Sequence, residues 1–412
     1  MPIFISSTPT MEEDDLRLSR NLLKAKEIED IKITLPGFSA QKHFFTNTGR
    51  ASLYLILQSL GIKKDDEVIV QSFTCMALIV PLLWLEIEPV YADIDPNTYN
   101  ISLDSIKKNL TEKTRSVIVQ HTFGIPADIL AIKTYIDSLN MERSEDERVY
   151  LIEDCAHCLN NRREDQYLGT FGDASFFSFG QDKVVSTTQG GCAIANDKGI
   201  EDKLEKIYEN IPEMTEKIVK YNLRYSLLWN IIKKAYYTPE FLASSKRLSK
   251  FTVGKFLILL FRLLGLIKQQ ASKEDFGNPN EDVSRLSFQQ KHLLKNQLEK
   301  IDRFTQHREE VINKYSRLLE LELGGSLIRY PVLVRDPSEV KSRLQEIRVI
   351  AGNWYNSPVI PRGIDLDKIK YEIGSCPNAE YLMEHIINLP TGVNVNDKDV
   401  EKIINIIKPY LL

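Results

Sequence analysis

Short apolar runs alternate with helical patterns along the first half of the chain, and this alternation restricts the fold more than any other feature. The apolar runs have the length of buried strands and lie at residues 67–70, 89–92, 116–119, 149–152, 174–177 and 192–195. Helical patterns separate them at 74–85, 103–110 and 128–139. Strands and helices in this order predict an α/β fold, with a mainly parallel central sheet that has helices on both faces.

Helical periodicity extends well beyond this region. It predicts a helix from Thr10 to about residue 27 and another from Thr48 to Leu60. Residues 200–300 are mainly helical in pattern, and a long amphipathic helix is expected to open at Ser287 and to run to Tyr315. Strand and helix patterns return at 329–334, 341–345 and 400–411. The end of the chain is therefore predicted to form a small α/β domain.

The overall charge and the cysteine content narrow the class of protein. The formal net charge is −4 over 412 residues, which gives no reason to expect binding to nucleic acid. Five widely spread cysteines do not suggest a disulfide framework and suit a reducing compartment. Met1 is followed by no basic stretch of the kind that opens a secretory signal. We therefore expect a cytoplasmic protein.

Cys155 and Cys158 have the spacing of a redox pair or of half a zinc site. A structural zinc site needs a second pair of Cys or His ligands, and the sequence offers none at ligand spacing elsewhere. No metal site is therefore expected.

Residues 226–270 combine a basic excess with a continuous apolar run. The segment holds eight basic residues against one acid, Glu240. The run from Phe256 to Lys268 is apolar on nearly every side but too short to span a bilayer, which takes ~20 residues. One interpretation is a helix buried against the core or a partner subunit. The other is a helix that lies in a membrane interface beside anionic lipid. Burial is the favoured interpretation of the two.

An acid and a lysine each follow a predicted strand. Asp154 comes directly after the run 149–152 and Glu153, and Lys183 comes a short loop after the run 174–177. An enzyme that uses pyridoxal phosphate (PLP) needs such a pair. The lysine amine forms a Schiff base with the cofactor aldehyde, and the carboxylate keeps the pyridine nitrogen protonated. Both positions fall at the carboxyl ends of strands, where ligands bind in α/β folds.

A phosphate site is predicted at the start of the helix that opens near Thr48. Gly49 would let the backbone approach a phosphate, and the helix N-terminus would supply N–H donors and the positive end of the helix dipole. Ser178, between the strand and Lys183, is a second candidate donor. Each residue alone would be unremarkable, so the prediction depends on their order along the chain.

These motifs resemble those of the DegT/StrS-type sugar aminotransferases, which are PLP enzymes of fold type I. The stretches that carry the resemblance are Gly49-Arg-Ala-Ser-Leu53, His121-Thr-Phe-Gly-Ile-Pro126, Glu153-Asp-Cys-Ala-His157, Gly169-Thr-Phe-Gly-Asp173, Ser178 to Gly191 and Asn388-Leu-Pro390. The resemblance covers nearly the whole chain apart from the basic segment. It implies a PLP-binding large domain with an N-terminal helix over 1–225, a basic, apolar helical insertion over 226–283, and a long helix with a small C-terminal α/β domain over 284–412.

The resemblance also implies a role for individual residues. Lys183 would bind the cofactor covalently and move the proton during the reaction. Asp154 would pair with the pyridinium nitrogen, and His157 would lie beside the phenolic oxygen of the cofactor. The phosphate would be held by Gly49, Arg50 and Ser178. The other branch of this family carries histidine in place of the lysine and dehydrates its substrates, so Lys183 favours transamination.

The chain departs from the family pattern at the residue that stacks on the cofactor ring. The family usually has an aromatic residue there, whereas this chain has Cys75. Cys75 is therefore the predicted contact, and Phe73 or His121 are the alternatives that would cover the ring in its place. A milder departure is Thr188-Gln-Gly-Gly191, where the family has Gly-Glu-Gly-Gly.

The family also donates an asparagine from the neighbouring subunit to the phosphate. Asn222 is the preferred match in this chain. If the motif aligns at Arg285 instead, the position is taken by Val283 and the contact is lost. A ligand shared in this way implies a homodimer, because each active site would be incomplete alone.

The expected activity is transfer of an amino group, with glutamate as the expected donor, to a keto sugar attached to a nucleotide. The expected setting is the synthesis of an amino sugar or a surface polysaccharide. Two rival hypotheses are a non-catalytic or regulatory relative that binds PLP, and a PLP enzyme that eliminates or decarboxylates. The basic segment 226–270 adds a contact with a membrane surface as an alternative to burial.

Overall fold

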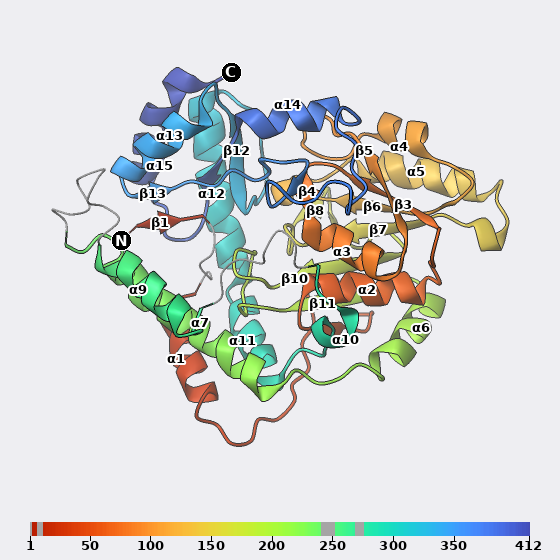
Figure 1. The fold of residues 1–412 in the computed structure, drawn as a ribbon, viewed down its shortest axis with the longest axis horizontal. Coiled ribbons are helices and arrows are strands. Elements are labelled where there is room, and N and C mark those ends of the chain that lie inside the picture. The colour runs from red at the N-terminus through yellow and green to blue at the C-terminus, as the bar shows by residue number, and fades with distance from the viewer. Residues whose placement is uncertain (1, 6–10, 240–251, 268–275) are drawn as a thin grey trace.

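The computed structural model describes residues 2–5, 11–239, 252–267 and 276–412 (Figure 1). Thr10, the predicted start of the first helix, lies outside this range. The helix α1 (Glu13–Leu22) begins where the N–H of Glu12 donates to Asp15 (2.8 Å), and it ends earlier than residue 27. No helix within these ranges is long and apolar enough to cross a membrane.

A seven-stranded sheet forms the centre of the described part of the chain. Its order is β2 (Phe44–Thr46), β11 (Gly191–Ala195), β10 (Ala174–Ser178), β7 (Tyr150–Asp154), β6 (Thr114–Gln120), β3 (Glu67–Gln71) and β5 (Glu88–Ala92). Neighbouring strands from β10 to β5 are parallel, and β11 is antiparallel to both its neighbours. The predicted mainly parallel sheet is therefore confirmed.

Successive residues of each central strand contribute to different hydrophobic cores. Val68 and Val70 of β3 join one core, together with Ile118 of β6, and Ile69 and Val117 join the other. Side chains alternate between the faces of a sheet, so two cores mean that both faces are covered. This is why the strands appear in the sequence as continuous apolar runs.

The helices between the strands cover the two faces of the sheet (Figure 1). The helices α2 (Gly49–Ser59) and α3 (Met76–Trp84) contribute to the core that contains Val68 and Val70. The helices α4 (Leu103–Asn109) and α5 (Ile129–Asn140) contribute to the opposite core. The helix α6 (Lys198–Tyr208) packs beside α2. The helices α2 to α5 match the predicted patterns to within a few residues.

The long helix expected from Ser287 to Tyr315 is instead two helices. The first, α11 (Phe288–Leu298), ends before Lys300, whose ψ of 1° departs from helical geometry. The second, α12 (Ile301–Leu319), runs from there towards the C-terminal part. The uninterrupted amphipathic pattern hid the break, because a local change in backbone angles at Lys300 leaves the hydrophobic periodicity on both sides intact.

The C-terminal part is a small α/β unit. It contains β12 (Arg329–Leu333), α13 (Pro337–Glu346), β13 (Val349–Ile350), β14 (Val359–Ile360), α14 (Pro377–His385), β15 (Ile386–Pro390) and α15 (Asp397–Ile407). The strands β12 and β15 are antiparallel partners. The N-terminal strand β1 (Ile3–Phe4) pairs with β13, and β14 pairs with β4 (Thr74–Cys75) of the large domain. The two ends of the chain and the large domain are thus joined by backbone hydrogen bonds.

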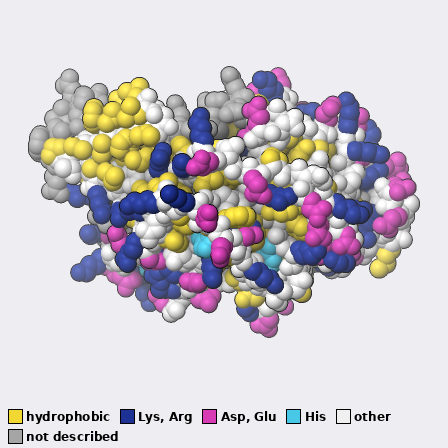
Figure 2. All heavy atoms as spheres, turned by 90° about the horizontal axis from the view of Figure 1, so that it is seen from below, with side chains coloured by type: hydrophobic (Ala, Val, Ile, Leu, Met, Phe, Trp, Pro, Cys, Tyr) yellow, Lys and Arg dark blue, Asp and Glu magenta, His cyan; other side chains and the backbone are white. Residues whose placement is uncertain are grey.

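The basic segment contributes two helices that pack on one another. The helix α9 (Val253–Leu263) lays Leu257, Ile258 and Phe261 against α7 (Glu216–Ala235). Its other face is exposed, with exposed fractions of 59% at Phe256 and 76% at Leu263. This face forms an apolar patch at one end of the molecule (Figure 2). The prediction of burial therefore holds for one face of the helix within this chain and not for the other.

The carboxylate of Glu153 anchors a loop to the end of β7. The side chain is fully buried. One oxygen accepts hydrogen bonds from the N–H groups of Phe171 (2.7 Å) and Gly172 (2.8 Å), and the other accepts one from Gly169 (2.8 Å). The second oxygen also lies 3.1 Å from Nε2 of His121. This residue therefore fixes the strand end from which the next residue, Asp154, projects.

We expect Glu153→Ala to lower the free energy of unfolding by at least about 3 kcal/mol. Three backbone N–H groups would lose their acceptor, and each unsatisfied buried donor costs about 1–3 kcal/mol. Urea denaturation followed by circular dichroism measures the loss. Asp165→Ala, which removes an exposed acid from a nearby turn, is the control and is expected to change stability by less than about 0.5 kcal/mol. Equal effects for the two variants would contradict the anchoring role.

Candidate active site

A cavity of about 150 Å³ lies at the carboxyl edge of the central sheet. It is lined by Thr48, Gly49, Arg50, Thr74, Cys75, Ala77, Leu78, Gln120, Asp154, Ala156, His157, Phe176, Ser178, Lys183 and Tyr355. Parallel strands end at the same edge, so side chains that follow β6, β7 and β10 converge there. All of the predicted site residues lie on this cavity except Asn222.

Asp154 projects from the last position of β7 and is almost completely buried. Its Oδ1 accepts a hydrogen bond from the N–H of Ala156 (2.9 Å). Burial raises the pKa of Asp154, while this hydrogen bond and the positive charge of Lys183 act in the opposite direction. Among the described residues no hydrogen bond reaches Oδ2. One carboxylate oxygen is thus held in place and the other can pair with a cationic ligand atom.

His157 is held in one neutral form. The N–H of Phe123 donates to Nδ1 of the imidazole (3.1 Å), so Nδ1 is an acceptor and the proton of the neutral ring is on Nε2. Burial, followed by the charges of Lys183 and Arg329, holds the pKa of His157 well below its usual range. The site therefore contains a histidine that can donate a hydrogen bond from Nε2 without carrying a charge.

The N-terminus of α2 and Ser178 form one end of the cavity. Thr48 caps the helix, because its hydroxyl accepts a hydrogen bond from the N–H of Ala51 (3.1 Å). A side chain at Gly49 would place its Cβ 3.0 Å from Cβ of Ser178, which is closer than nearly all such contacts. The helix N-terminus, the hydroxyl of Ser178 and the guanidinium of Arg50 are donors suited to a phosphate.

Lys183 follows β10 on a loop that several helices hold. Tyr225 of α7 donates to the side chain of Gln181 (2.8 Å), and Arg308 of α12 donates to the carbonyl of Val184 (3.0 Å). These contacts lie on both sides of Lys183 in the sequence, so they fix the loop while the lysine side chain extends to the cavity. The preceding residue, Asp182, forms an ion pair with the buried Arg329 (2.9 Å).

Cys75 and Tyr355 line the part of the cavity where a ring-stacking residue was expected. Cys75 is the N-cap of α3, and its strand pairs with β14 of the C-terminal unit. That unit also places Tyr355 on the cavity wall, fully within the protein. The ring of Tyr355 stacks on Phe123 with an interplanar angle of 17°, and Phe123 stacks on His157 with one of 11°. The sequence had no signal for Tyr355, because it reaches the site from a distant segment.

Neither alternative for the ring contact lies on the cavity. Phe73 is completely buried and packs against Tyr99, Phe123 and Tyr355 behind the cavity wall. His121 is also completely buried, with Nε2 beside Glu153 and Nδ1 accepting from the N–H of Ala127 (3.1 Å). Of the three residues considered, the structure brings only Cys75 to the site.

Asn222 lies away from the cavity, on the inner face of α7. It is 1% exposed, and its amide donates to the side chain of Gln189 (3.3 Å). Its backbone carbonyl accepts a hydrogen bond from the hydroxyl of Thr188 (2.9 Å). Asn222 therefore supports the loop after Lys183 within its own subunit. The alternative position, Val283, is buried in the hydrophobic core. A contact from either residue to a neighbouring subunit stays a prediction.

His121 lies close to Cys155 and Cys158, with one potential ligand atom from each within 4.8 Å of the others. A metal would need a ring nitrogen of His121 with a free lone pair. Nδ1 accepts from a backbone N–H and Nε2 faces Glu153. Both ring nitrogens of His121 are thus occupied by contacts within the protein. We therefore do not propose a metal ion at His121, Cys155 and Cys158.

A lysine on the loop after one strand, a buried carboxylate at the end of another, a neutral histidine and a helix N-terminus surround this single cavity. In an α/β fold with a mainly parallel sheet, this arrangement defines the class of PLP-dependent enzymes. The residues also fit the cofactor chemically, since a buried acid faces the space for the ring and phosphate donors occupy one end of the cavity.

Comparison with known sequences assigns the family. The sequence model of the DegT/DnrJ/EryC1/StrS aminotransferase family matches residues 19–222 and 258–408, and the chain belongs to this family. Aminotransferases of this family use PLP. The match leaves out residues 223–257, which is a shorter stretch than the insertion expected over 226–283.

Curated relatives and solved structures agree with this assignment. The chain is 32% identical to GDP-perosamine synthase of Escherichia coli O157:H7 over 170 residues, which is 40% of this chain and 44% of the relative. It is 30% identical to UDP-N-acetyl-3-dehydro-alpha-D-glucosamine 3-aminotransferase of Acidithiobacillus ferrooxidans over 46% of this chain and 50% of the relative. These alignments thus span half of the relatives or less. Helicobacter pylori PseC, an aminotransferase involved in the biosynthesis of pseudoaminic acid, shares the fold, with a TM-score of 0.67 and 18% identity over 98% of this chain and 99% of that chain.

We expect Asp154→Asn to reduce the rate of amino transfer at least about 100-fold, which is the usual size of the loss when one electrostatic contact to a reacting group is removed. An amide has almost the same shape but cannot hold a ring nitrogen in its protonated state. Steady-state kinetics with a saturating cofactor concentration measure the effect. Asp104→Asn, at an exposed position on α4 outside the cavity, is the matched control. An Asp154→Asn enzyme as fast as the wild type would remove this residue from the site.

Proposed function

We propose that this protein transfers an amino group from an amino acid to a keto sugar attached to a nucleotide. One observation carries the proposal: Lys183, Asp154 and His157 line one buried cavity together with phosphate donors. When bound there, PLP supplies an aldehyde that captures amino groups and a ring that withdraws electrons from the neighbouring carbon. The side chains of this chain would hold the cofactor and move the proton.

Each group in the cavity has a defined task under this proposal. With PLP bound, Asp154 would keep a proton on the ring nitrogen, and His157 would donate from Nε2 to the phenolic oxygen. Arg50, Ser178 and the N-terminus of α2 hold the phosphate. Tyr355 and Cys75 cover the ring. The geometry agrees with these tasks, because the carboxylate and the phosphate donors lie on different elements around one cavity.

Lys183 is the residue that we propose to move the proton. Once released from the cofactor, its amine can take a proton from Cα of the amino acid and deliver it to C4′ of the cofactor. The side chain is only partly buried and lines both the small cavity and a second, larger one. It therefore lies where the cofactor and a substrate would meet. A lysine at this position favours transamination over dehydration.

The names of relatives support the sugar substrate. A GDP-perosamine synthase and a 3-aminotransferase for a UDP-linked sugar both align with this chain. A relative from Bacillus subtilis is named as a spore coat polysaccharide biosynthesis protein and is 29% identical over 44% of this chain. We propose a nucleotide-linked keto sugar as the acceptor, within amino-sugar or surface polysaccharide biosynthesis. Glutamate is the proposed amino donor. Glutamine is the alternative, because a relative from Streptomyces kanamyceticus is named L-glutamine:2-deoxy-scyllo-inosose aminotransferase. Assays with a panel of amino donors would distinguish the two.

We further propose a cytoplasmic homodimer with active sites at the subunit interface, as the family resemblance implies. A non-catalytic PLP-binding relative is the alternative function. Cys75 favours that alternative, since a thiol offers a smaller contact to a ring than an aromatic side chain does. The complete set of Lys183, Asp154 and His157 favours the enzyme.

We expect Lys183→Ala to abolish amino transfer and the visible absorbance band of lysine-bound PLP. Among the residues that the structure describes, no other lysine lines the cavity, so we expect no second amine to replace it. Absorbance spectroscopy and a coupled assay with a nucleotide-linked keto sugar measure the two effects. Lys198→Ala, at an exposed site on α6, is the control. If Lys183→Ala turned over as fast as the wild type, the mechanism would be refuted. If the wild type bound PLP normally but turned over with no amino donor, the non-catalytic alternative would be supported.

We propose that the exposed face of α9 lies on an anionic membrane surface. The face consists of Val253, Phe256, Leu259 and Leu263, which follow helical spacing and are all exposed by 42% or more. Arg262 lies beside them. Such a helix, apolar on its outer face and flanked by basic residues, is typical of helices that lie in the membrane interface.

We expect the double substitution Phe256→Asp and Leu263→Asp to abolish sedimentation with phosphatidylserine-containing vesicles and to leave amino transfer intact. Two charges on the outer face would oppose insertion without touching the face that packs on α7. Ile373→Asp, which changes an apolar residue exposed by 72% elsewhere on the surface, is the control and should sediment like the wild type. Wild-type protein that ignores such vesicles would contradict the proposal, and loss of the dimer by the double variant would assign the face to a second copy of the chain.

A further inference from the structure

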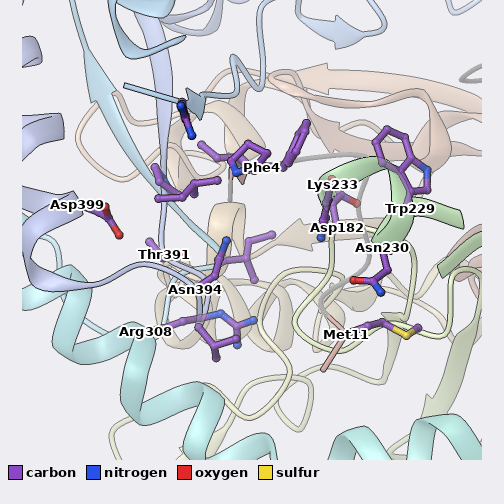
Figure 3. A pocket seen from close by; sticks show the side chains of 18 of the residues that line it. Phe4, Met11, Asp182, Trp229, Asn230, Lys233, Arg308, Thr391, Asn394 and Asp399 are labelled. Carbon is purple, nitrogen blue, oxygen red and sulfur yellow. The ribbon is translucent and has the colours of Figure 1, made fainter. Parts of the chain in front are cut away.

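A second and larger cavity, of about 500 Å³, is lined in part by Asp182 of the lysine loop (Figure 3). Its walls come from the N-terminal residues, α7, α12 and the loop after β15. Asp182 and Lys183 line it, and Lys183 also lines the cofactor cavity. A molecule bound in the larger cavity can therefore reach the amine of Lys183.

Arg308 projects into this cavity from α12 with most of its hydrogen-bonding capacity unused. The residue is 3% exposed. Its Nη2 donates to the carbonyl of Val184 (3.0 Å), whereas Nε and Nη1 have no hydrogen-bond partner among the described residues. Burial lowers the pKa of Arg308 to about 10, and no carboxylate of the described chain counters this effect. A buried guanidinium without an anion is unfavourable, so the site is suited to an anionic ligand.

The acids of the cavity are already engaged elsewhere. Asp182 pairs with Arg329 (2.9 Å), and Asp399 accepts a hydrogen bond from the N–H of Asn396 (3.2 Å) at the start of α15. The cations on the cavity wall are Lys183, Lys233, Arg308 and Arg348. Counted over the described residues, four cationic side chains against two acidic ones line the cavity, and a lining of net positive charge attracts an anion.

One wall of the cavity comes from the stretch that the family model does not match. Ser226, Trp229, Asn230 and Lys233 lie on one face of α7 and line the cavity. They belong to the stretch 223–257 that the family model does not match. Trp229 also makes an edge-to-face contact with Phe4 of the N-terminal strand (6.2 Å between ring centroids). The wall thus combines aromatic surface with a second cation, Lys233.

We propose that this larger cavity binds the phosphate-bearing part of the sugar substrate, with Arg308 as its main anion-binding residue and the face of α7 as its specificity-determining wall. The proposal rests on the proposed function and extends it to named residues. In Figure 3, Arg308 and Lys233 approach the cavity from different helices, α12 and α7. A diphosphate carries anionic oxygens on two phosphorus atoms and can therefore engage both cations at once. The volume, over three times that of the cofactor cavity, also suits a sugar phosphate better than an amino acid.

The test separates the two half-reactions by single-turnover spectroscopy. The amino acid is mixed with the PLP-loaded enzyme, and the phosphorylated keto sugar is mixed with the pyridoxamine form that the amino acid generates. We expect Arg308→Gln and Lys233→Ala each to raise the apparent Kd of the phosphorylated keto sugar at least about 10-fold. Arg308→Lys should bind this substrate more tightly than Arg308→Gln and less tightly than the wild type. Amination of the cofactor by the amino acid should change less than about 2-fold in Lys233→Ala, which leaves the contact between Arg308 and the carbonyl of Val184 in place. Lys234→Ala, at the exposed neighbour of Lys233 on α7, is the control and should match the wild type. A defect confined to the amino-acid half-reaction would overturn the proposal and assign Arg308 to the donor carboxylate.

A second measurement does not depend on turnover. Inorganic pyrophosphate should bind to the PLP-loaded wild type in calorimetry, and its binding should weaken at least about 10-fold in Arg308→Gln and in Lys233→Ala. Equal pyrophosphate affinity in the wild type and both variants would overturn the subsite, whether or not the protein is an aminotransferase. A protein that binds pyrophosphate through these residues but never aminates its cofactor would instead leave the subsite standing and refute the proposed function.

Discussion

The alignment of three strand ends is the constraint on which the rest of the site depends. In the hydrogen-bond register of the sheet, Asp154 lies opposite Gln120 of β6 and opposite Phe176 of β10. All three residues line the cofactor cavity. Successive side chains of a strand point to opposite faces, so a slip of one residue would turn Asp154 away from the cavity. The buried anchor at Glu153 opposes such a slip, because its carboxylate holds three backbone N–H groups of the adjacent loop.

The lysine loop links the two cavities and explains why helices from distant parts of the chain matter to the site. Arg308 contributes to both, since its Nη2 donates to the carbonyl of Val184, next to Lys183, and the residue also lines the larger cavity. Asp182 also has two contacts, because it lines the larger cavity and forms an ion pair with Arg329. Burial acting alone would raise the pKa of Asp182, but the charges of Lys183 and Arg329 outweigh it and lower that pKa. Asp182 therefore stays ionised and balances part of the positive charge around the lysine.

Much of the fold could be predicted from the sequence, and the exceptions have physical reasons. Strands buried on both faces leave continuous apolar runs, and all six strands predicted in the first half of the chain are present. Strand β2 was missed, because its three residues are too short to form a pattern. The break at Lys300 was missed as well, because the apolar periodicity continues across it. The first helix was predicted to end too late, at about residue 27, whereas α1 ends at Leu22. The residues at the end of this helix and those of the following loop are similarly polar, so the sequence does not mark the boundary.

The sequence by itself determined the family, the covalent role expected of Lys183 and the residues around it, because these depend on short motifs whose chemistry is local. Only the tertiary structure decided which distant side chains join them. Tyr355 reaches the cofactor cavity because β14 pairs with the strand of Cys75, and Arg308 reaches the larger cavity because α12 crosses behind the lysine loop. It also turned Asn222 inward and exposed one face of α9. These outcomes follow from packing between segments far apart in the chain, which no local pattern encodes.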